Sequence, residues 1–295
     1  MTTTEHLVPV GAIELCVESF GSADDPALLL IGNSMLDWDD DICLRLAAGG
    51  RHVVRYDLRD TGCSTVADPD APAYGLGDLA GDAAGLLGAL GLGSAHVAGL
   101  GVGGWVAQRL ALDHPARVRS LTLIATRPTA PGPNDPDLPE HDPAVMSHLM
   151  EAGEPDWTDR TSAIEAVVAW GRVTAGPGDF DAVALAEWAG RVHDRTVAVA
   201  PPGAALVPRV RASLLATTFA ALDAGPRWRE RLPELAVPAL VVHGAEDRFF
   251  PLGNGRALAD EIPDGELLTL PDAGHTLSPA AWETVVPAIL RHTAG

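Results

Sequence analysis

The sequence of 295 residues contains no lysine, because all 20 of its basic residues are arginine. Catalysis through a lysine Schiff base, or with a lysine as general base, is therefore excluded. Cysteine is scarce as well: Cys16, Cys43 and Cys63 lie far apart and outside any C-x-x-C spacing. This number and spacing favour neither a disulfide framework nor a zinc site, and we expect the protein to use no metal or other cofactor.

Long apolar runs and basic patches are also missing. No apolar stretch reaches the roughly 18–20 residues that a membrane span needs, and the first residues do not have the charged and apolar regions of a signal peptide. The 40 acidic residues give a net charge of −20, whereas binding of nucleic acid phosphates requires basic patches. We expect a cytoplasmic protein, monomeric or homodimeric, that binds neither membranes nor nucleic acid.

What the sequence does contain is an alternation of two apolar patterns. The segments with the pattern of strands are 7–10, 12–18, 27–31, 52–57, 95–100, 118–124, 239–244 and 266–270. Apolar residues at helical spacing occur in 75–90, in the segment that ends at His114 and in 279–291. This alternation predicts an α/β fold with a mostly parallel, doubly wound sheet, in which the first two strands form an antiparallel hairpin at one edge.

Residues 127–230 have a different character from the rest of the chain. The Pro- and Asp-rich stretch 128–143 is followed by segments with apolar residues at helical spacing, including 144–152 and 161–174. No run with the pattern of a strand occurs there. We therefore expect a helical cap at 127–230, inserted into a core domain that comprises 1–126 and 231–295.

The turn between the strand at 95–100 and the following helix fits two glycine motifs. Gly99, Gly101 and Gly104 match the dinucleotide-binding fingerprint G-x-G-x-x-G. Gly99 and Gly103 match the nucleophile elbow G-x-S-x-G, with Gly101 in the place of the serine. A dinucleotide site also needs an acidic residue at the end of the next strand, which here is followed by Ala-Thr-Arg. The elbow is therefore the favoured interpretation.

Three other motifs flank the elbow along the chain. They are Gly32–Ser34 after one strand, the stretch 57–62 after the next, and a C-terminal pair formed by 243–247 and 272–275. In this order the motifs resemble those of the α/β-hydrolase fold family over nearly the whole chain. Within that family the sequence is similar to the methylesterases that tailor aromatic polyketides such as anthracyclines, through 55–64 and the Ala-Leu-Asp-His ending of the helix after the elbow.

The resemblance implies a catalytic histidine and an acid that orients it. By position, His275 is the base and Asp247 is the acid, and the family's chain order of nucleophile, acid and histidine is kept. The nucleophile position is Gly101, which has no side chain and cannot attack a substrate. The glycine is compatible with the turn, because glycine adopts the strained backbone of an elbow freely.

The same resemblance implies an oxyanion hole of backbone N–H groups beside the turn. Its expected donors are Val102, which follows the nucleophile position, and the loop residues Asn33 and Ser34. One alternative is that Ser34 replaces the missing nucleophile, whereas a loop hydroxyl of this kind is more often a turn cap. Asp37 and Trp38 come next in the chain, either facing the substrate or packed in the core.

Large apolar side chains are expected to contact the substrate. The candidate substrate-binding residues are Trp38, Trp105, Met146, Met150, Trp170 and Trp188. A Trp- and Met-rich lid suits a flat aromatic ligand and excludes water from the site. Structural roles are expected for His243, as a core or supporting histidine, and for Asp57 and Arg59, which brace the loop after their strand through hydrogen bonds and an ion pair.

These observations lead to one favoured function and two alternatives. The favoured function is cofactor-free acid/base catalysis of a cyclisation, lyase or isomerase-type step on a bulky polyketide-like intermediate of antibiotic biosynthesis or other secondary metabolism. The first alternative is a carboxyl methylesterase, a serine hydrolase, in an inactivated Gly101 form. The second is a homologue that binds a small molecule without catalysis.

Overall fold

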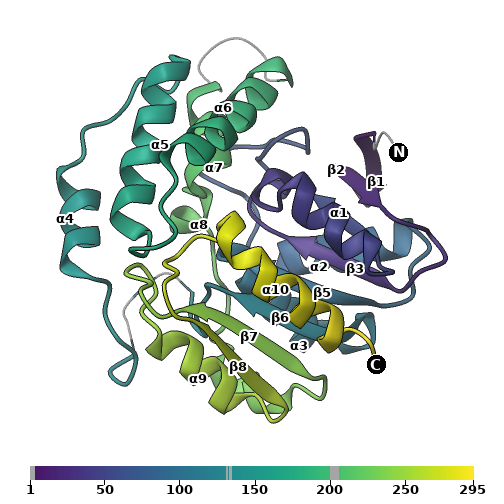
Figure 1. The fold of residues 1–295 in the computed structure, drawn as a ribbon. Helices are drawn as coiled ribbons and strands as arrows, with labels where there is room; N and C mark the ends of the chain where they lie inside the picture. The colour runs from purple at the N-terminus through teal and green to yellow at the C-terminus, as the bar shows by residue number, and fades with distance from the viewer. Residues whose placement is uncertain (1–3, 131, 133–134, 200–205) are drawn as a thin grey trace.

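The computed structural model describes residues 4–130, 132, 135–199 and 206–295. These residues form an eight-stranded sheet with the strand order β1-β2-β4-β3-β5-β6-β7-β8 (Figure 1). The strands are β1 (His6–Val10), β2 (Ile13–Phe20), β3 (Ala27–Ile31), β4 (His52–Tyr56), β5 (Ala95–Leu100), β6 (Val118–Ile124), β7 (Ala239–Gly244) and β8 (Gly265–Leu270).

Most neighbouring strands of the sheet are parallel. Pairing is antiparallel between β1 and β2 and between β2 and β4, and parallel between the other neighbours. Gly11 closes the first hairpin with a φ of 61°, a conformation that favours glycine. Strands β3 and β7 are buried along their whole length, as parallel strands inside a covered sheet are. The predicted mostly parallel sheet with an antiparallel edge hairpin is confirmed.

Helices cover both faces of the sheet. They are α1 (Asp40–Ala48), α2 (Leu76–Ala89), α3 (Val102–Asp113), α9 (Gly253–Glu261) and α10 (Pro279–His292). Helices α1 and α10 lie in front of the sheet in Figure 1 and contribute to one apolar cluster, while α2, α3 and α9 contribute to another. Leu28 and Leu30 of β3 belong to the first cluster and Leu29 and Ile31 to the second, because side chains alternate between the two faces of a strand.

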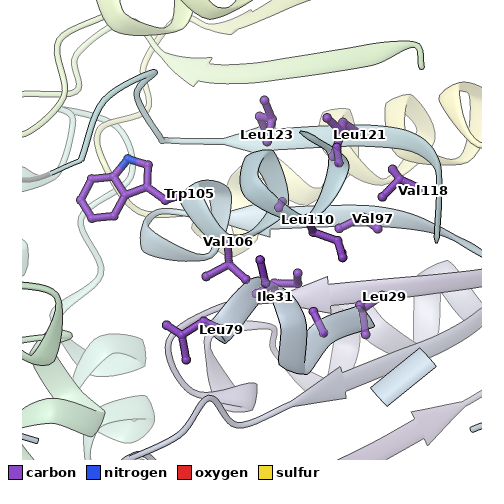
Figure 2. Packing of buried hydrophobic residues seen from close by; sticks show 14 of the residues in the cluster. Leu29, Ile31, Leu79, Val97, Trp105, Val106, Leu110, Val118, Leu121 and Leu123 are labelled. Atoms are coloured by element: carbon purple, nitrogen blue, oxygen red, sulfur yellow. The ribbon is translucent and has the colours of Figure 1, made fainter. Parts of the chain in front are cut away.

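The second cluster fixes the helix that follows the glycine turn. Val106 and Leu110 of α3 lie over Ile31 of β3, Val97 of β5 and Leu121 of β6 (Figure 2). All five side chains are buried, and burying each contributes about 1.5–3 kcal/mol relative to leaving it exposed. The start of α3 is therefore held firmly at the carboxyl ends of the central strands.

Between β6 and β7 the described chain is mainly helical. The helices there are α4 (Pro143–Glu151), α5 (Arg160–Thr174), α6 (Ala182–Val199), α7 (Leu206–Leu215) and α8 (Thr218–Ala221). These helices, called the cap below, lie in the upper left of Figure 1, and three of them meet in a cluster that includes Val167, Ala189 and Val210. That residues 127–230 form a subdomain of their own stays a prediction.

Short 3-10 turns complete the described structure. They are η1 (Met35–Asp37), η2 (Pro115–Arg117) and η3 (Arg229–Glu234). Across the described ranges, the helices are too short or too polar to cross a bilayer.

Candidate active site

The turn between β5 and α3 is built from glycines. Gly101 is the N-cap of α3, with φ 56° and ψ −118°, and its N–H donates to the Ile124 carbonyl oxygen at 2.9 Å. A methyl group on Gly103 would overlap the Ile31 carbonyl oxygen, whereas one on Gly101 would meet no atom within 4 Å. Gly103 is therefore required by packing, while at Gly101 only the positive φ favours glycine. The turn has formed without a serine.

His275 and Asp247 come from two neighbouring loops and form a hydrogen-bonded pair. Asp247 follows β7, His275 follows β8, and the distance from His275 Nδ1 to Asp247 Oδ2 is 2.9 Å. The other carboxylate oxygen of Asp247 accepts hydrogen bonds from the backbone N–H groups of Phe249 at 2.9 Å and Phe250 at 2.8 Å. The carboxylate is therefore fixed on both sides, and it fixes the imidazole ring in turn.

Asp247 is held in its charged form by the surrounding groups. Burial alone would raise the pKa of its carboxyl, but His275 and His243 together hold that pKa well below its usual range. His243 Nε2 lies 2.6 Å from the Phe250 carbonyl oxygen and 3.5 Å from Asp247 Oδ2, and the ring is buried. His243 therefore has the geometry of the supporting histidine that the sequence indicated.

Aromatic rings surround His275. The rings of Phe249 and Phe250 stand nearly perpendicular to the imidazole, with centroids 4.9 and 5.1 Å away. Trp170 of the cap meets Phe249 edge to face at 5.2 Å, and His141 stacks on Phe249 at 4.8 Å. Of the expected substrate-binding residues, Trp170 is thus connected through the ring of Phe249 to the His275–Asp247 pair, called the dyad below.

Other expected substrate-binding residues lie elsewhere. Trp38 is fully buried in the cluster under α1, and Trp105 is packed between Phe219 and Phe250 in the core. Met146 and Met150 are 39% and 81% exposed on the surface of α4, and the Trp188 indole N–H donates to the Leu36 carbonyl oxygen at 2.9 Å. That Trp38, Trp105, Met146 and Met150 contact the substrate stays a prediction. In this structure the two indoles are buried and the two methionines lie on the surface, because apolar character alone does not tell core from surface or site.

The loop after β3 differs from the expected oxyanion hole. The backbone N–H groups of Asn33 and Ser34 both donate to Asp37 Oδ2, at 2.7 and 3.2 Å. Of the expected donors, these two are therefore already bound by a carboxylate of the same chain, while Val102 is the first residue of α3, where helix N–H groups have no partner within the helix. These N–H groups are already hydrogen-bonded because a capping box between Ser34 and Asp37 caps the N-terminus of η1.

Ser34 has a capping role in this loop. Its Oγ accepts a hydrogen bond from the Leu36 N–H and donates one to Asp57 Oδ1, both at 3.3 Å. The side chain of Asn33 donates to the carbonyl oxygens of Ala212 and Ser213 in the cap, at 2.8 and 3.1 Å. The hydroxyl that was considered as a substitute nucleophile thus donates a hydrogen bond to the carboxylate of Asp57, which follows β4.

Asp37 is the unexpected group of the site. It is partly buried, and burial together with the nearby charge of Asp57 raises the pKa of its carboxyl to about 7, against the opposing effect of the two bound amides. A carboxyl group with this pKa exchanges its proton near neutral pH, which is the property of a functional acid or base. From the sequence, Asp37 was expected either to face the substrate or to pack in the core. Nothing in the sequence indicated that its carboxylate binds the backbone N–H groups of Asn33 and Ser34.

Comparison with known proteins assigns the chain to a family. Residues 30–279 match the alpha/beta hydrolase fold. The chain belongs to this family. It is 30% identical to the rhodomycin D methylesterase DauP of Streptomyces sp. strain C5, over 98% of this chain and 97% of that protein. It is also 30% identical to the rhodomycin D methylesterase DnrP of Streptomyces peucetius, over 95% of each chain.

Solved structures support the same fold. The esterase RhEst1 from Rhodococcus sp. ECU1013 superposes with a TM-score of 0.73 over the full length of both chains at 22% identity. The 2-hydroxy-6-oxo-6-phenylhexa-2,4-dienoate hydrolase from Rhodococcus sp. strain RHA1 has a TM-score of 0.72 at 18% identity, and the match covers 100% of this chain and 99% of that one. These structures support the fold, whereas the family match and the two full-length relatives confirm the resemblance to the α/β-hydrolase family and to its methylesterases.

In this α/β hydrolase, Asp57 links the loop after β3 to the cap. Its Oδ1 accepts the Met35 N–H at 2.9 Å, and its Oδ2 accepts the Cys63 N–H at 2.9 Å and pairs with Arg195 of α6 at 2.7 Å. Arg59 pairs instead with Asp82 of α2. The expected loop bracing by Asp57 is present, but its cationic partner comes from the cap, because Arg59 points to a different carboxylate.

Two phenylalanines and a histidine beside the dyad were not foreseen. Phe249 and Phe250 follow Asp247 almost directly in the sequence, so their position after the acid was the available signal. His141 lies more than 100 residues earlier, and only the fold brings it there. Within the described ranges, the side chains with atoms close enough to share a metal ion are Glu5, Cys16 and Cys63.

Proposed function

We propose that this α/β hydrolase is an enzyme that transfers protons on a bulky small-molecule substrate through His275, with no covalent intermediate on residue 101. The observation that carries the proposal is the combination of a complete His275–Asp247 pair, 2.9 Å apart, with Gly101 at the nucleophile position. A protein that had lost all catalysis would have no use for a charged carboxylate buried against a histidine.

His275 is prepared for proton transfer by its partner. Asp247 binds Nδ1, which leaves Nε2 as the nitrogen that takes or gives a proton at the substrate. Because the low pKa of Asp247 keeps it negative at neutral pH, it stabilises the imidazolium that forms when His275 takes a proton. The start of α3 next to Gly101 favours negative charge that develops on the substrate.

The state of the loop after β3 supports a step other than acyl transfer. In an α/β hydrolase, the oxyanion of a tetrahedral intermediate is bound by two N–H groups, one of them from this loop. Here the backbone N–H groups of Asn33 and Ser34 are bound to Asp37. An oxyanion whose negative charge is concentrated on one oxygen atom therefore lacks the hydrogen-bond donor from this loop. An enolate or phenolate spreads its charge over several atoms and depends less on a single donor, which suits cyclisation, elimination or isomerisation.

The substrate class follows from the rings and the relatives. Trp170 and Phe249, both partly exposed, supply aromatic surface close to His275, and flat aromatic ligands bind such surfaces. The full-length relatives are named as methylesterases of rhodomycin D. We therefore infer an aromatic polyketide-derived substrate and a role in antibiotic biosynthesis in the cytoplasm, with the protein as a monomer or homodimer.

A carboxyl methylesterase is the second candidate. Two observations favour it: the names of the full-length relatives, and the open space at Gly101, where a side-chain Cβ would meet no atom within 4 Å. On this view Gly101 stands in an otherwise ordinary esterase and removes only its nucleophile.

The test compares the protein with Gly101→Ser and His275→Ala on a p-nitrophenyl ester and on an aromatic polyketide methyl ester. The proposal expects the unchanged protein to convert the polyketide without releasing methanol, and His275→Ala to abolish this conversion. Methanol release by Gly101→Ser alone, with no conversion by the unchanged protein, would establish the methylesterase instead. Binding that His275→Ala leaves intact, with no turnover by any form, would identify a non-catalytic homologue.

A further inference from the structure

A pair of thiols lies beside a carboxylate that the proposed reaction does not use. Cys16 of β2 and Cys63 of the loop after β4 each place Sγ 3.7 Å from Glu5 Oε2, and the three groups lie within 4.8 Å of one another. The backbone brings them together, because the Cys16 N–H donates to Ser64 Oγ and the Thr65 N–H to the Glu14 carbonyl oxygen, both at 2.9 Å. The segment 63–65 therefore runs along β2.

Arg195 of the cap supplies a positive charge to this pair. Its Nη2 donates to Glu5 Oε2 at 2.8 Å, pairs with Asp57 Oδ2 at 2.7 Å and lies 3.4 Å from Cys16 Sγ. The guanidinium is largely buried. One cation thus faces two carboxylates and the thiols, and a thiolate next to it gains electrostatic stabilisation.

The two thiols differ in reactivity. The hydrogen bond with the Cys16 thiol lowers the pKa of the Cys63 thiol, and Arg195 lowers it further, against burial and the charges of Asp57 and Glu5. The same bond and burial raise the pKa of Cys16. Cys63 is partly exposed, whereas Cys16 is 3% exposed. An accessible thiol with a lowered pKa beside a second, protected thiol is the arrangement of a reactive and a resolving cysteine.

We propose that Cys63 and Cys16 form an oxidation site that reacts with hydrogen peroxide and closes to a disulfide. The Cys63 thiolate attacks one peroxide oxygen, the O–O bond breaks, and the departing hydroxide takes a proton to become water. The Cys16 thiol then attacks the sulfenic sulfur of Cys63, the S–O bond breaks, and a second water leaves with the Cys16 proton. The two thiols lose two electrons in total, and the peroxide is reduced to two waters.

The same three groups form a poor metal site. A divalent ion bound between Glu5 and the thiols would lie next to the guanidinium of Arg195, which already donates to Glu5 and approaches Cys16. Like charges at such short distances repel strongly where solvent is partly excluded. Arg195 stabilises a thiolate and opposes a metal cation, so oxidation is the chemistry that this cluster favours.

The thiol pair is connected to the loop of the candidate active site. The Cys63 N–H donates to Asp57 Oδ2, and Asp57 Oδ1 accepts from the Met35 N–H and from Ser34 Oγ. Drawing Cys63 Sγ towards Cys16 moves the backbone that holds Asp57. Oxidation is therefore expected to shift the loop that carries Asn33 and Ser34, whatever reaction the site performs.

The first experiment maps the disulfide in the intact protein. After treatment with hydrogen peroxide, mass spectrometry of non-reduced peptides should find Cys16 linked to Cys63, with a loss of two hydrogens that a reductant restores. Cys43 is fully buried, so Cys43→Ser serves as the matched control and should form the same link. Absence of the 16–63 link in the folded protein, or peroxide consumption that persists in Cys63→Ser, would overturn the proposal.

The second experiment measures the alkylation rate of Cys63 by iodoacetamide against pH. The groups that face it are Glu5, Cys16, Asp57, Arg195 and Arg209. The alkylation rate of Cys63 should rise at a lower pH than that of an ordinary exposed thiol of pKa near 8.5, and Arg195→Gln should move this rise to higher pH. Circular dichroism and an unreactive Cys43 verify that the variant is folded. An ordinary alkylation midpoint, or stoichiometric protection by Zn²⁺, would contradict the proposal and in the second case indicate a metal site.

Discussion

The backbone N–H of His275 donates to the carbonyl oxygen of Thr174, at 3.0 Å, so the loop of the proposed catalytic histidine is bonded to the end of cap helix α5. The neighbouring Gly274 N–H donates to Asp179 Oδ2 at 2.8 Å. Gly176 and Gly274 face each other so closely that a side chain on either would overlap the other segment. The position of the cap is therefore transmitted directly to the histidine.

This contact makes Gly176→Ala a sharp test of the link between cap and dyad. The new methyl group would collide with the backbone around Asp272 and Gly274, and relieving the overlap should cost about 1–3 kcal/mol of stability. We expect turnover to fall further than substrate binding, because the His275 loop is displaced. Gly153→Ala, at an exposed cap glycine with nothing within 4 Å, is the matched control and should leave both unchanged. Equal behaviour of the two variants would contradict the link.

Two glycines of the elbow should lose different amounts of stability when each is replaced by alanine. At Gly103 a methyl group would overlap the Ile31 carbonyl oxygen, so Gly103→Ala should separate α3 from β3 and lower the melting temperature markedly. At Gly101 the space is open, and the cost should be limited to the roughly 1–3 kcal/mol of a non-glycine residue at positive φ. Thermal unfolding of both variants measures the difference; a Gly101→Ala loss as large as that of Gly103→Ala would refute this reading of the turn.

The layout of the fold was largely predictable from the sequence. Strand β3 reads as a continuous apolar run and the hairpin around Gly11 as alternating residues, and these local patterns decide which strands are central and which lie at the edge. The His275–Asp247 pair was expected from the resemblance to the α/β-hydrolase family, and the parallel sheet brings both residues to the same edge.

The features that the sequence did not predict concern the directions in which side chains and N–H groups point, and no local sequence pattern contains these directions. Whether an indole such as Trp105 faces the core or the substrate is set by the packing of α3, and the sequence shows only that it is apolar. The N–H groups of Asn33 and Ser34 turn towards Asp37 because a one-turn helix closes there. The partner of Asp57 is Arg195, which lies 138 positions later in the sequence. Only the folding of cap helix α6 against the core brings the two side chains together.

Replacing Asp247 by asparagine should reveal its charge in a pH series. Because the pKa of Asp247 is depressed in the folded protein, its contribution to stability is fully present above the unfolded value of about 3.9 and is lost as pH falls towards the folded pKa. The stability difference between the protein and Asp247→Asn should therefore shrink below about pH 4. Urea unfolding at pH 3.5 and 7 measures it, and turnover at pH 7 should fall by about a thousandfold or more. A pH-independent difference would exclude a depressed pKa.

Asp37 should give the opposite pH dependence. Its pKa is raised to about 7 in the folded protein, so folding takes up a proton between about pH 4 and 7, and the carboxyl lowers stability as pH rises through this window. Asp37→Asn does not titrate. Its stability relative to the parent should improve by up to about 1.4 kcal/mol per pH unit across the window and stay constant above it. Urea midpoints at pH 5 and 8 decide the point, and a constant difference between the two proteins would show that Asp37 titrates normally.

Asp37 also makes a prediction for the serine form of the enzyme. In Gly101→Ser, the restored hydroxyl lies next to a hole whose loop amides still bind the Asp37 carboxylate, so hydrolysis of a p-nitrophenyl ester should be slow. Adding Asp37→Ala frees these amides, and one recovered oxyanion donor is worth about 10²–10³ in rate. Asp37→Asn keeps an acceptor oxygen and should recover less. If Asp37→Ala leaves the rate of the serine form unchanged or lowers it, Asp37 serves only the turn, and the loop amides are not part of the oxyanion hole.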